Sequence, residues 1–245
     1  MSDTKSSSSS SSNGGMKPSL SFVGDTAQNH VFAQLNFCLN KPNHKVARQP
    51  PDSKSRDAWK AEAGSFHGGL HLALSKPPLG GNCGEMAFMA YRKVISVAMS
   101  SSVTLAVAAV SIGADWGGAG NHCFVLVGSD AGFITAIAAE PKTLAVTTDS
   151  LPKSWGVNVY VCDPWIDDGY CGTFNAVTRS TKFVTAWESY LERVVKQAAD
   201  KVITRALNTA GGSLTLTVDD CVVISQSTTT VEAARLTTAG GKKTG

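Results

Sequence analysis

Residues 77–83, with the sequence PPLGGNC, constrain the fold of this chain more than any other segment. Prolines and glycines interrupt regular structure, and directly after them Met86, Ala90 and Val94 recur at helical spacing. A helix is therefore predicted to begin at or close to Cys83. A cysteine in this place meets the partial positive charge of a helix N-terminus, which favours its thiolate form.

Later in the chain, five segments have the apolar or alternating patterns typical of β-strands: residues 103–112, 122–127, 133–139, 157–162 and 214–218. The second begins at His122. The fourth ends at Asp163, because Pro164 cannot donate a hydrogen bond to a strand ladder. Residues 133–139 follow the turn sequence GSDAG and are predicted to form a hairpin with 122–127.

Two further helices are predicted at residues 27–39 and 183–202, where apolar side chains recur at helical spacing. The sequence shows no internal repeat and no series of βαβ units with a glycine-rich phosphate loop. An α+β fold is therefore predicted, with the helix that begins at Cys83 packed on an antiparallel sheet.

The chain is predicted to have one globular body, at residues 19–225. Of its 245 residues, 42% are hydrophobic, which is enough for a core. Residues 1–18 are rich in serine, and residues 226–245 carry few large apolar side chains. Such segments bury too little surface to offset the entropy of ordering, so a disordered leader and a flexible C-terminal tail are predicted.

Charge and hydropathy exclude several classes of function. The net charge of +3 is too small and too evenly spread to indicate nucleic-acid binding. No segment has the roughly 18 consecutive apolar residues of a membrane helix. The N-terminus also lacks the basic start and apolar stretch of a cleaved signal peptide. We therefore expect no nucleic-acid partner, no membrane span and no such signal.

The six cysteines are scattered through a chain large enough to fold without disulfides, so they are predicted to be mostly free thiols. No CxxC pair or close Cys/His cluster offers four zinc ligands. The nearest possibility is His67 and His71, but the two glycines between them make a rigid helical ligand pair unfavourable. No metal and no cofactor are predicted.

Three residues are placed to act together in nucleophilic catalysis. Cys83 opens a helix, His122 opens a strand and Asp163 closes a strand. In a Cys–His–Asp triad the histidine takes the thiol proton and later protonates a leaving amine, while the carboxylate holds the imidazole in the required tautomer. Each placement alone is common in structural roles, but the three together predict a catalytic triad.

Other residues are candidates for supporting roles. The main-chain N–H groups at the start of the helix, including that of Cys83, are expected to bind the oxyanion formed when a carbonyl is attacked. A side-chain donor, either Asn82 or Gln34, is a candidate to complete this hole. Trp116 and Trp165 flank the site in predicted loops, as walls of a substrate groove or as covers of the core.

Four neighbouring residues are weaker candidates. Cys123 lies next to His122 on a strand, so it is expected to point away from the histidine and into the core. Cys162 is likewise expected to point away from Asp163. Asp167 and Asp168 lie in a predicted turn and are alternatives to Asp163 as the orienting acid.

These motifs resemble those of papain-like bacterial effectors and toxins, a group related to transglutaminases. The resemblance covers residues 79–165 and rests on GNCGEMA around Cys83, NHCFVLV around His122 and VCDP around Asp163. It implies a papain-like fold, with these three residues as nucleophile, base and orienting acid. One departure is that papain-type proteases carry a glutamine shortly before the cysteine, where this chain has prolines.

The resemblance also implies a function. Members of this group cleave peptide bonds or deamidate glutamine in host proteins, so a cysteine-dependent amide hydrolase with a host protein substrate is expected, deamidation being slightly favoured. Alternatives are a catalytically inactive papain-like binding module and a transglutaminase. The serine-rich leader is similar to the secretion signals of injected effectors, so secretion without a cleaved signal peptide, into the host cytoplasm, is expected. The oligomeric state stays open.

Overall fold

A computed structural model shows the arrangement of the helices and strands. It describes residues 19–38, 79–99, 104–112, 122–139, 143–149, 151–152, 155, 158–166, 169–173, 177–179, 182–184, 186–198 and 201–225. The predicted leader, the predicted tail, and Trp116, Asp167, Asp168, His67 and His71 lie outside the described residues.

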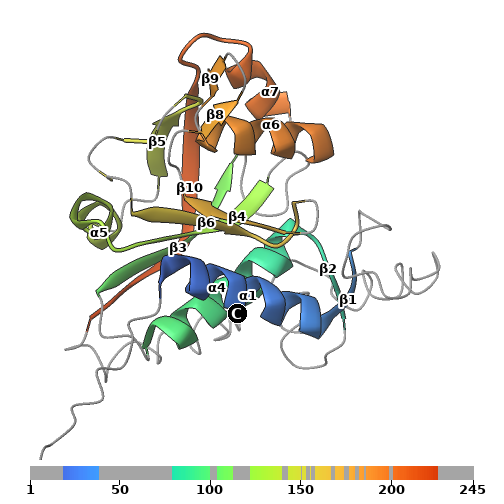
Figure 1. Ribbon diagram of the computed structural model, residues 1–245, viewed down its shortest axis with the longest axis vertical. Coiled ribbons are helices and arrows are strands. Elements are labelled where there is room, and N and C mark those ends of the chain that lie inside the picture. Colours follow the sequence, from blue (N-terminus) through green and yellow to red (C-terminus); the bar gives the residue numbers. More distant parts are fainter. Residues whose placement is uncertain are drawn as a thin grey trace, which may run out of the picture.

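Six antiparallel strands form the main sheet: β3 (Leu105–Ile112), β4 (His122–Gly128), β5 (Thr143–Thr147), β6 (Val159–Asp163), β7 (Tyr170–Thr173) and β10 (Ser213–Ile224). Their order across the sheet is β5-β10-β3-β4-β6-β7 (Figure 1). Every residue of β3 and β4 is buried, because other elements cover both faces at the centre of the sheet. The predicted α+β class and antiparallel sheet are confirmed.

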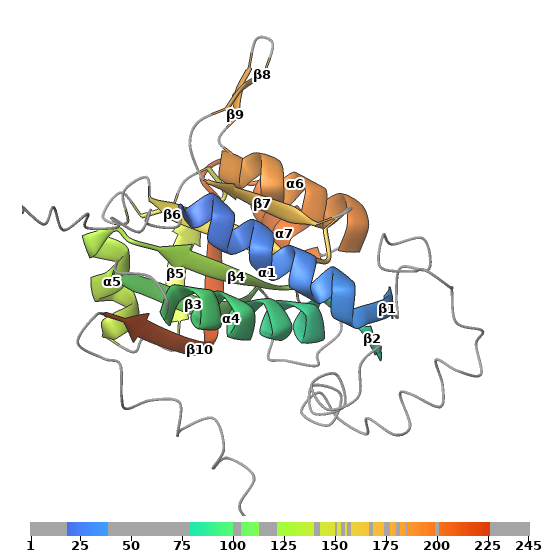
Figure 2. The ribbon, with the colours of Figure 1, turned by 60° about the horizontal axis from the view of Figure 1, so that its bottom comes forward.

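Helices lie on opposite sides of this sheet. Helices α1 (Leu20–Gln34) and α4 (Cys83–Met99) pack against each other and against β4 and β6. On the other side lie α6 (Ala186–Ala198) and α7 (Lys201–Leu207), as Figure 2 shows. The packing of the Cys83 helix on the sheet is thus confirmed.

Smaller elements complete the described structure. A short parallel pair, β1 (Leu35–Cys38) and β2 (Leu79–Gly81), joins the end of α1 to the start of α4. Strands β8 (Val177–Arg179) and β9 (Lys182–Val184) form a hairpin.

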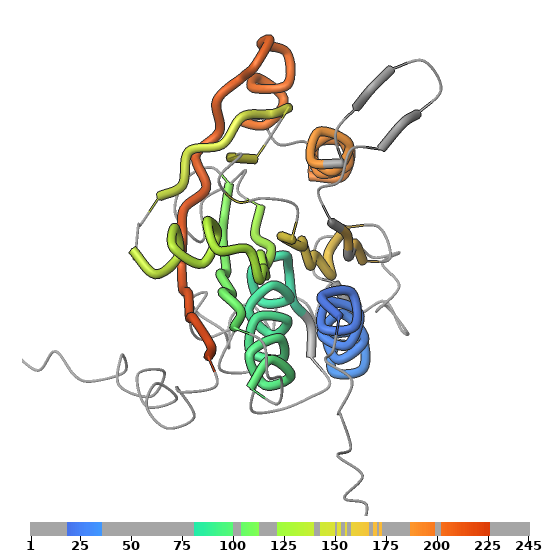
Figure 3. The backbone as a smooth tube through the Cα atoms, turned by 60° about the vertical axis from the view of Figure 1, so that its left-hand side comes forward, coloured from blue at the N-terminus to red at the C-terminus, as the bar shows by residue number. Residues whose placement is uncertain are grey.

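Strand β10 joins the edge strand β5 to the rest of the sheet. It pairs with β5 along its first part and with β3 along most of its length (Figure 3). The register shifts between Val218, which faces Val110, and Asp220, which faces Ala109. Asp219 is therefore the extra residue of a β-bulge.

The predicted strand at residues 133–139 is wrong, because this segment forms helix α5 (Ala131–Ala138). The Asp130 side chain caps the helix, accepting a hydrogen bond of 2.9 Å from the Gly132 N–H. Phe133 and Ile137, four residues apart, are both buried against the rest of the fold. A helical period thus explains the apolar residues that suggested a strand.

Two predicted helices have different bounds in the structure. The first begins earlier than residue 27, because Ser19 caps α1, and its last predicted residues belong to β1. The second, at residues 183–202, is divided: Phe183 lies in β9, α6 ends at Ala198 and α7 begins at Lys201.

Replacing the cap of α5 tests this correction. The substitution Asp130→Ala removes the side-chain acceptor and is expected to lower the free energy of unfolding by about 1 kcal/mol. Asp130→Asn, which retains an acceptor oxygen, is expected to stay within a few tenths of a kcal/mol of the wild type. Urea denaturation measures both, and equal losses in the two variants would contradict a helix cap at this residue.

Candidate active site

The nucleophile helix begins at Cys83 because its first turn is capped. The Asn82 N–H donates to the Glu85 carboxylate at 2.9 Å, and the Met86 N–H donates to the Asn82 carbonyl at 3.0 Å. This is the helix side of a capping box. Gly81 allows it, because a Cβ there would lie 3.1 Å from the Glu85 Cβ. Cys83 consequently lies at the positive end of the α4 dipole.

His122 and Asp163 meet on neighbouring strands. His122 is the first residue of β4 and Asp163 the last of β6, and the antiparallel register brings these two strand ends together. The His122 Nε2 lies 2.6 Å from the Asp163 Oδ2, and both side chains are fully buried. The structure therefore brings together the predicted base and its orienting acid.

Asp163 accepts two more hydrogen bonds. The Tyr190 hydroxyl donates to Oδ2 at 2.8 Å, and the Trp165 N–H donates to Oδ1 at 3.0 Å. Burial, together with the Asp163 charge, raises the pKa of Tyr190 well above its usual value, so the phenol stays a donor. Sequence reasoning missed Tyr190, although its place three residues after Trp187 put it on the apolar face of the predicted helix.

Aromatic rings enclose the histidine. The ring centroid of Trp165 lies 5.2 Å from that of His122. The Phe124 ring stacks on the His122 ring, with the two centroids 6.0 Å apart. Trp165 is only 3% exposed, so its ring covers His122 instead of facing open solvent. Of the two tryptophans predicted to flank the site, Trp165 thus lies next to His122, and Trp116 lies outside the described residues.

The His122 ring also interacts with the Cys83 thiol. Because Asp163 engages Nε2, the nitrogen left for Cys83 is Nδ1, which is buried and has no hydrogen-bond partner among the described residues. Burial disfavours the charged imidazole, but the Asp163 charge and hydrogen bond prevail and raise the pKa of His122 to about 10. An imidazolium is thus favoured at neutral pH.

The pKa of Cys83 is shifted in the opposite direction, downward. A hydrogen bond from the Cys123 thiol and the interactions with His122 outweigh burial and hold the pKa of Cys83 well below its usual value. The two shifts together favour a thiolate–imidazolium pair. His122 is more basic in the folded chain than in the unfolded one, so its contribution to stability is complete below about pH 6.5 and is lost as the pH rises toward 10.

Cys123 has the predicted position but also a contact that was not predicted. It is buried and points to the opposite face of β4 from His122, as expected, but its thiol is hydrogen-bonded to Cys83. The predicted packing of α4 on the sheet brings the first residue of this helix to β4, a contact that the prediction did not include. Cys162 does point away from Asp163, because its thiol donates to the Gly24 carbonyl of α1 at 3.6 Å.

The two candidates for the side-chain oxyanion donor lie in different places. Asn82 is half-buried next to Cys83, and its Oδ1 has no hydrogen-bond partner among the described residues. Its side chain is thus not the cap of α4. Gln34 ends α1 and precedes Leu35, which pairs with Leu79, so the register places it at the far end of the β1–β2 pair from Asn82.

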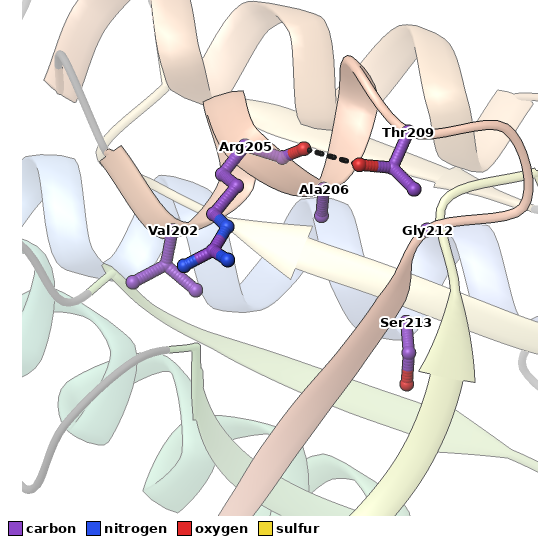
Figure 4. A pocket seen from close by; sticks show the side chains of 6 residues that line it. All are labelled: Val202, Arg205, Ala206, Thr209, Gly212 and Ser213. Carbon is purple, nitrogen blue, oxygen red and sulfur yellow. Dashed lines mark hydrogen bonds between the residues drawn. The ribbon is translucent and has the colours of Figure 1, made fainter.

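The described part of the chain holds no group of three His, Cys, Asp or Glu side chains arranged to bind a metal ion. None of its helices is long and apolar enough to cross a membrane. A pocket of about 420 Å³ lies between α7 and the start of β10 (Figure 4), lined by Val202, Arg205, Ala206, Thr209, Gly212 and Ser213. It includes none of the predicted site residues.

No protein-family model, curated protein or solved structure matches the chain. The functional argument therefore rests on the geometry of Cys83, His122 and Asp163.

Alkylation with iodoacetamide tests the state of Cys83. At about pH 6 an ordinary thiol is almost entirely protonated, so Cys83 is expected to react about 10–100 times faster than an ordinary cysteine. His122→Ala should remove most of this advantage. Peptide mass spectrometry follows Cys83, with Cys221 of the same chain as internal reference. A Cys83 rate that rises only near pH 8–9 would contradict the ion pair.

The substitution Tyr190→Phe tests how much the hydrogen bond from Tyr190 to Asp163 contributes to stability. The variant keeps the ring that stacks on Trp187 but removes a hydrogen bond to a buried carboxylate. The free energy of unfolding at neutral pH is expected to fall by about 1.5–3 kcal/mol, as measured by urea denaturation. A loss below about 0.5 kcal/mol would show that the hydroxyl contributes little.

Proposed function

We propose that this protein is a cysteine-dependent amide hydrolase, in which Cys83 is the nucleophile, His122 the general base and acid, and Asp163 the orienting residue. The observation that carries the proposal is the buried pair of His122 and Asp163, whose Nε2 and Oδ2 atoms lie 2.6 Å apart, together with the interaction of the same His122 ring with the Cys83 thiol. The low pKa of Cys83 supplies the reactive thiolate.

In the first half of the reaction, the Cys83 thiolate attacks the amide carbonyl carbon, and the carbonyl oxygen becomes an oxyanion. The main-chain N–H groups in the first turn of α4 are the kind of donor that stabilises an oxyanion, and the Asn82 side chain lies beside them. His122 then gives a proton to the leaving nitrogen, the C–N bond breaks, and a thioester remains on Cys83.

In the second half, a water molecule attacks the thioester carbonyl. His122, now neutral, takes a proton from the water, and the C–S bond breaks to release a carboxylic acid and the Cys83 thiolate. The Asp163 carboxylate orients the ring and stabilises each imidazolium that forms. Its own position depends on the hydrogen bonds from Tyr190 and Trp165.

The proposed substrate is a protein of a host cell, and the proposed setting is that of a papain-like effector injected into the host. Attack on a glutamine side chain releases ammonia, whereas attack on the backbone releases a new amino terminus. Both use the same thioester chemistry. We favour glutamine deamidation because the motifs around Cys83, His122 and Asp163 resemble a group rich in such enzymes.

Treatment of a eukaryotic cell lysate tests this proposal. Wild-type protein is expected to convert glutamine to glutamate in at least one lysate protein, as seen by peptide mass spectrometry, and Cys83→Ala is expected to lose this activity. Cys221→Ala, at a half-buried cysteine away from the site, is the matched control and should retain it.

Other outcomes distinguish the alternatives. New amino termini that depend on Cys83 would indicate proteolysis, and incorporation of a labelled primary amine would indicate a transglutaminase. Identical lysates after wild-type and Cys83→Ala treatment would contradict hydrolysis and favour a papain-like module that only binds its partner.

A further inference from the structure

The thiols of Cys83 and Cys123 are hydrogen-bonded to each other where the start of α4 meets β4. Both are reduced cysteines in the structure. We propose that this pair is a redox modification site, which a hydroperoxide converts into a Cys83–Cys123 disulfide and a thiol reductant restores. The inference needs only a reactive Cys83 and holds whichever reaction the site performs.

The fold places these two thiols together and keeps Cys162 and Cys221 apart from them. A disulfide requires sulfurs that can approach to about 2 Å, and a pair in hydrogen-bond contact is already close. Cys162 faces α1 instead. Cys221 on β10 pairs with Ala108 and Cys123 on β4 pairs with Ser111, so the two residues flank β3 on opposite sides, three residues apart along it, which separates them by about 14 Å.

The two thiols have different environments, which suit different roles. Cys83 is half-buried and has the depressed pKa of a thiol that reacts with oxidants. The hydrogen bond to the Cys83 thiolate, burial, and the charges of Asp219 and Asp163 raise the pKa of Cys123 well above its usual value. Cys123 therefore stays protonated and unreactive while Cys83 is a thiolate.

Oxidation of Cys83 changes this situation. The thiolate attacks one peroxide oxygen, the O–O bond breaks, and the released hydroxide takes up a proton to form water. Cys83 is then a neutral sulfenic acid, so Cys123 no longer faces a thiolate, whose hydrogen bond and charge both raise the pKa of Cys123. Cys123 becomes easier to ionise next to the oxidised sulfur.

The second step closes the disulfide. The Cys123 sulfur attacks the Cys83 sulfur, an S–S bond forms, the S–O bond breaks, and the departing hydroxide takes the Cys123 proton as water. In sum, two thiols and one peroxide give a disulfide and two waters. The nucleophile is then blocked, and it is also protected from irreversible oxidation to the sulfinic acid.

Peptide mapping tests the proposal on the full chain. The tryptic peptides 61–92 and 94–142 contain Cys83 and Cys123 as their only cysteines. After brief treatment with hydrogen peroxide and non-reducing digestion, these two peptides are expected to appear as one cross-linked species, which dithiothreitol separates. Sulfinic or sulfonic acid on Cys83 without this species in the wild type would overturn the proposal.

A pair of variants tests the role of Cys123. The loss of Cys123 also alters the reactivity of Cys83, so the peroxide dose is adjusted for each protein. In every protein, the dose is the one that lowers the labelling of Cys83 by iodoacetamide by the same fraction. Dithiothreitol should then restore Cys83 labelling almost completely in the wild type and in Cys221→Ala, but only a minor fraction in Cys123→Ala. Equal recovery in all three proteins would overturn the role of Cys123 as the partner thiol.

Discussion

The buried carboxylate of Asp163 is the group on which the rest of the site depends. An unpaired charge in a protein interior is costly, and this one is compensated by hydrogen bonds from His122, Tyr190 and the Trp165 main chain. These three donors belong to β4, to α6 and to the chain just after β6. One carboxylate therefore fixes the position of the α6 helix relative to the sheet and the orientation of the histidine ring at the same time.

The alternation of side chains along β4 divides the site into two halves. His122 and Phe124 face α6 and the Asp163 carboxylate, whereas Cys123 faces the opposite side, where α4 packs. Cys83, at the start of α4, interacts with both the His122 ring and the Cys123 thiol. The same nucleophile thus has an acid–base partner on one side and a second sulfur on the other, so hydrolysis and oxidation compete for one atom.

The sequence predicted those features that depend on local rules. Prolines and glycines before Cys83, and the proline after Asp163, mark where a helix begins and a strand ends, and the structure has both at these places. Tyr190 and the contact of Cys123 with Cys83 depend on how distant elements pack, so no local pattern indicated them. Helix α5 was mistaken for a strand because a short apolar segment fits either period, and the cap at Asp130 was the signal that was overlooked.

The protonation state of His122 tests the central claim, a thiolate–imidazolium pair held by Asp163. Side-chain nitrogen chemical shifts, recorded by NMR across the pH range and assigned with a His122 variant, report it directly. The account predicts that both ring nitrogens of His122 carry a proton at neutral pH, and that Cys83→Ser lowers the pKa of His122. A ring that is neutral at pH 7, or a pKa unchanged by loss of the Cys83 sulfur, would contradict it.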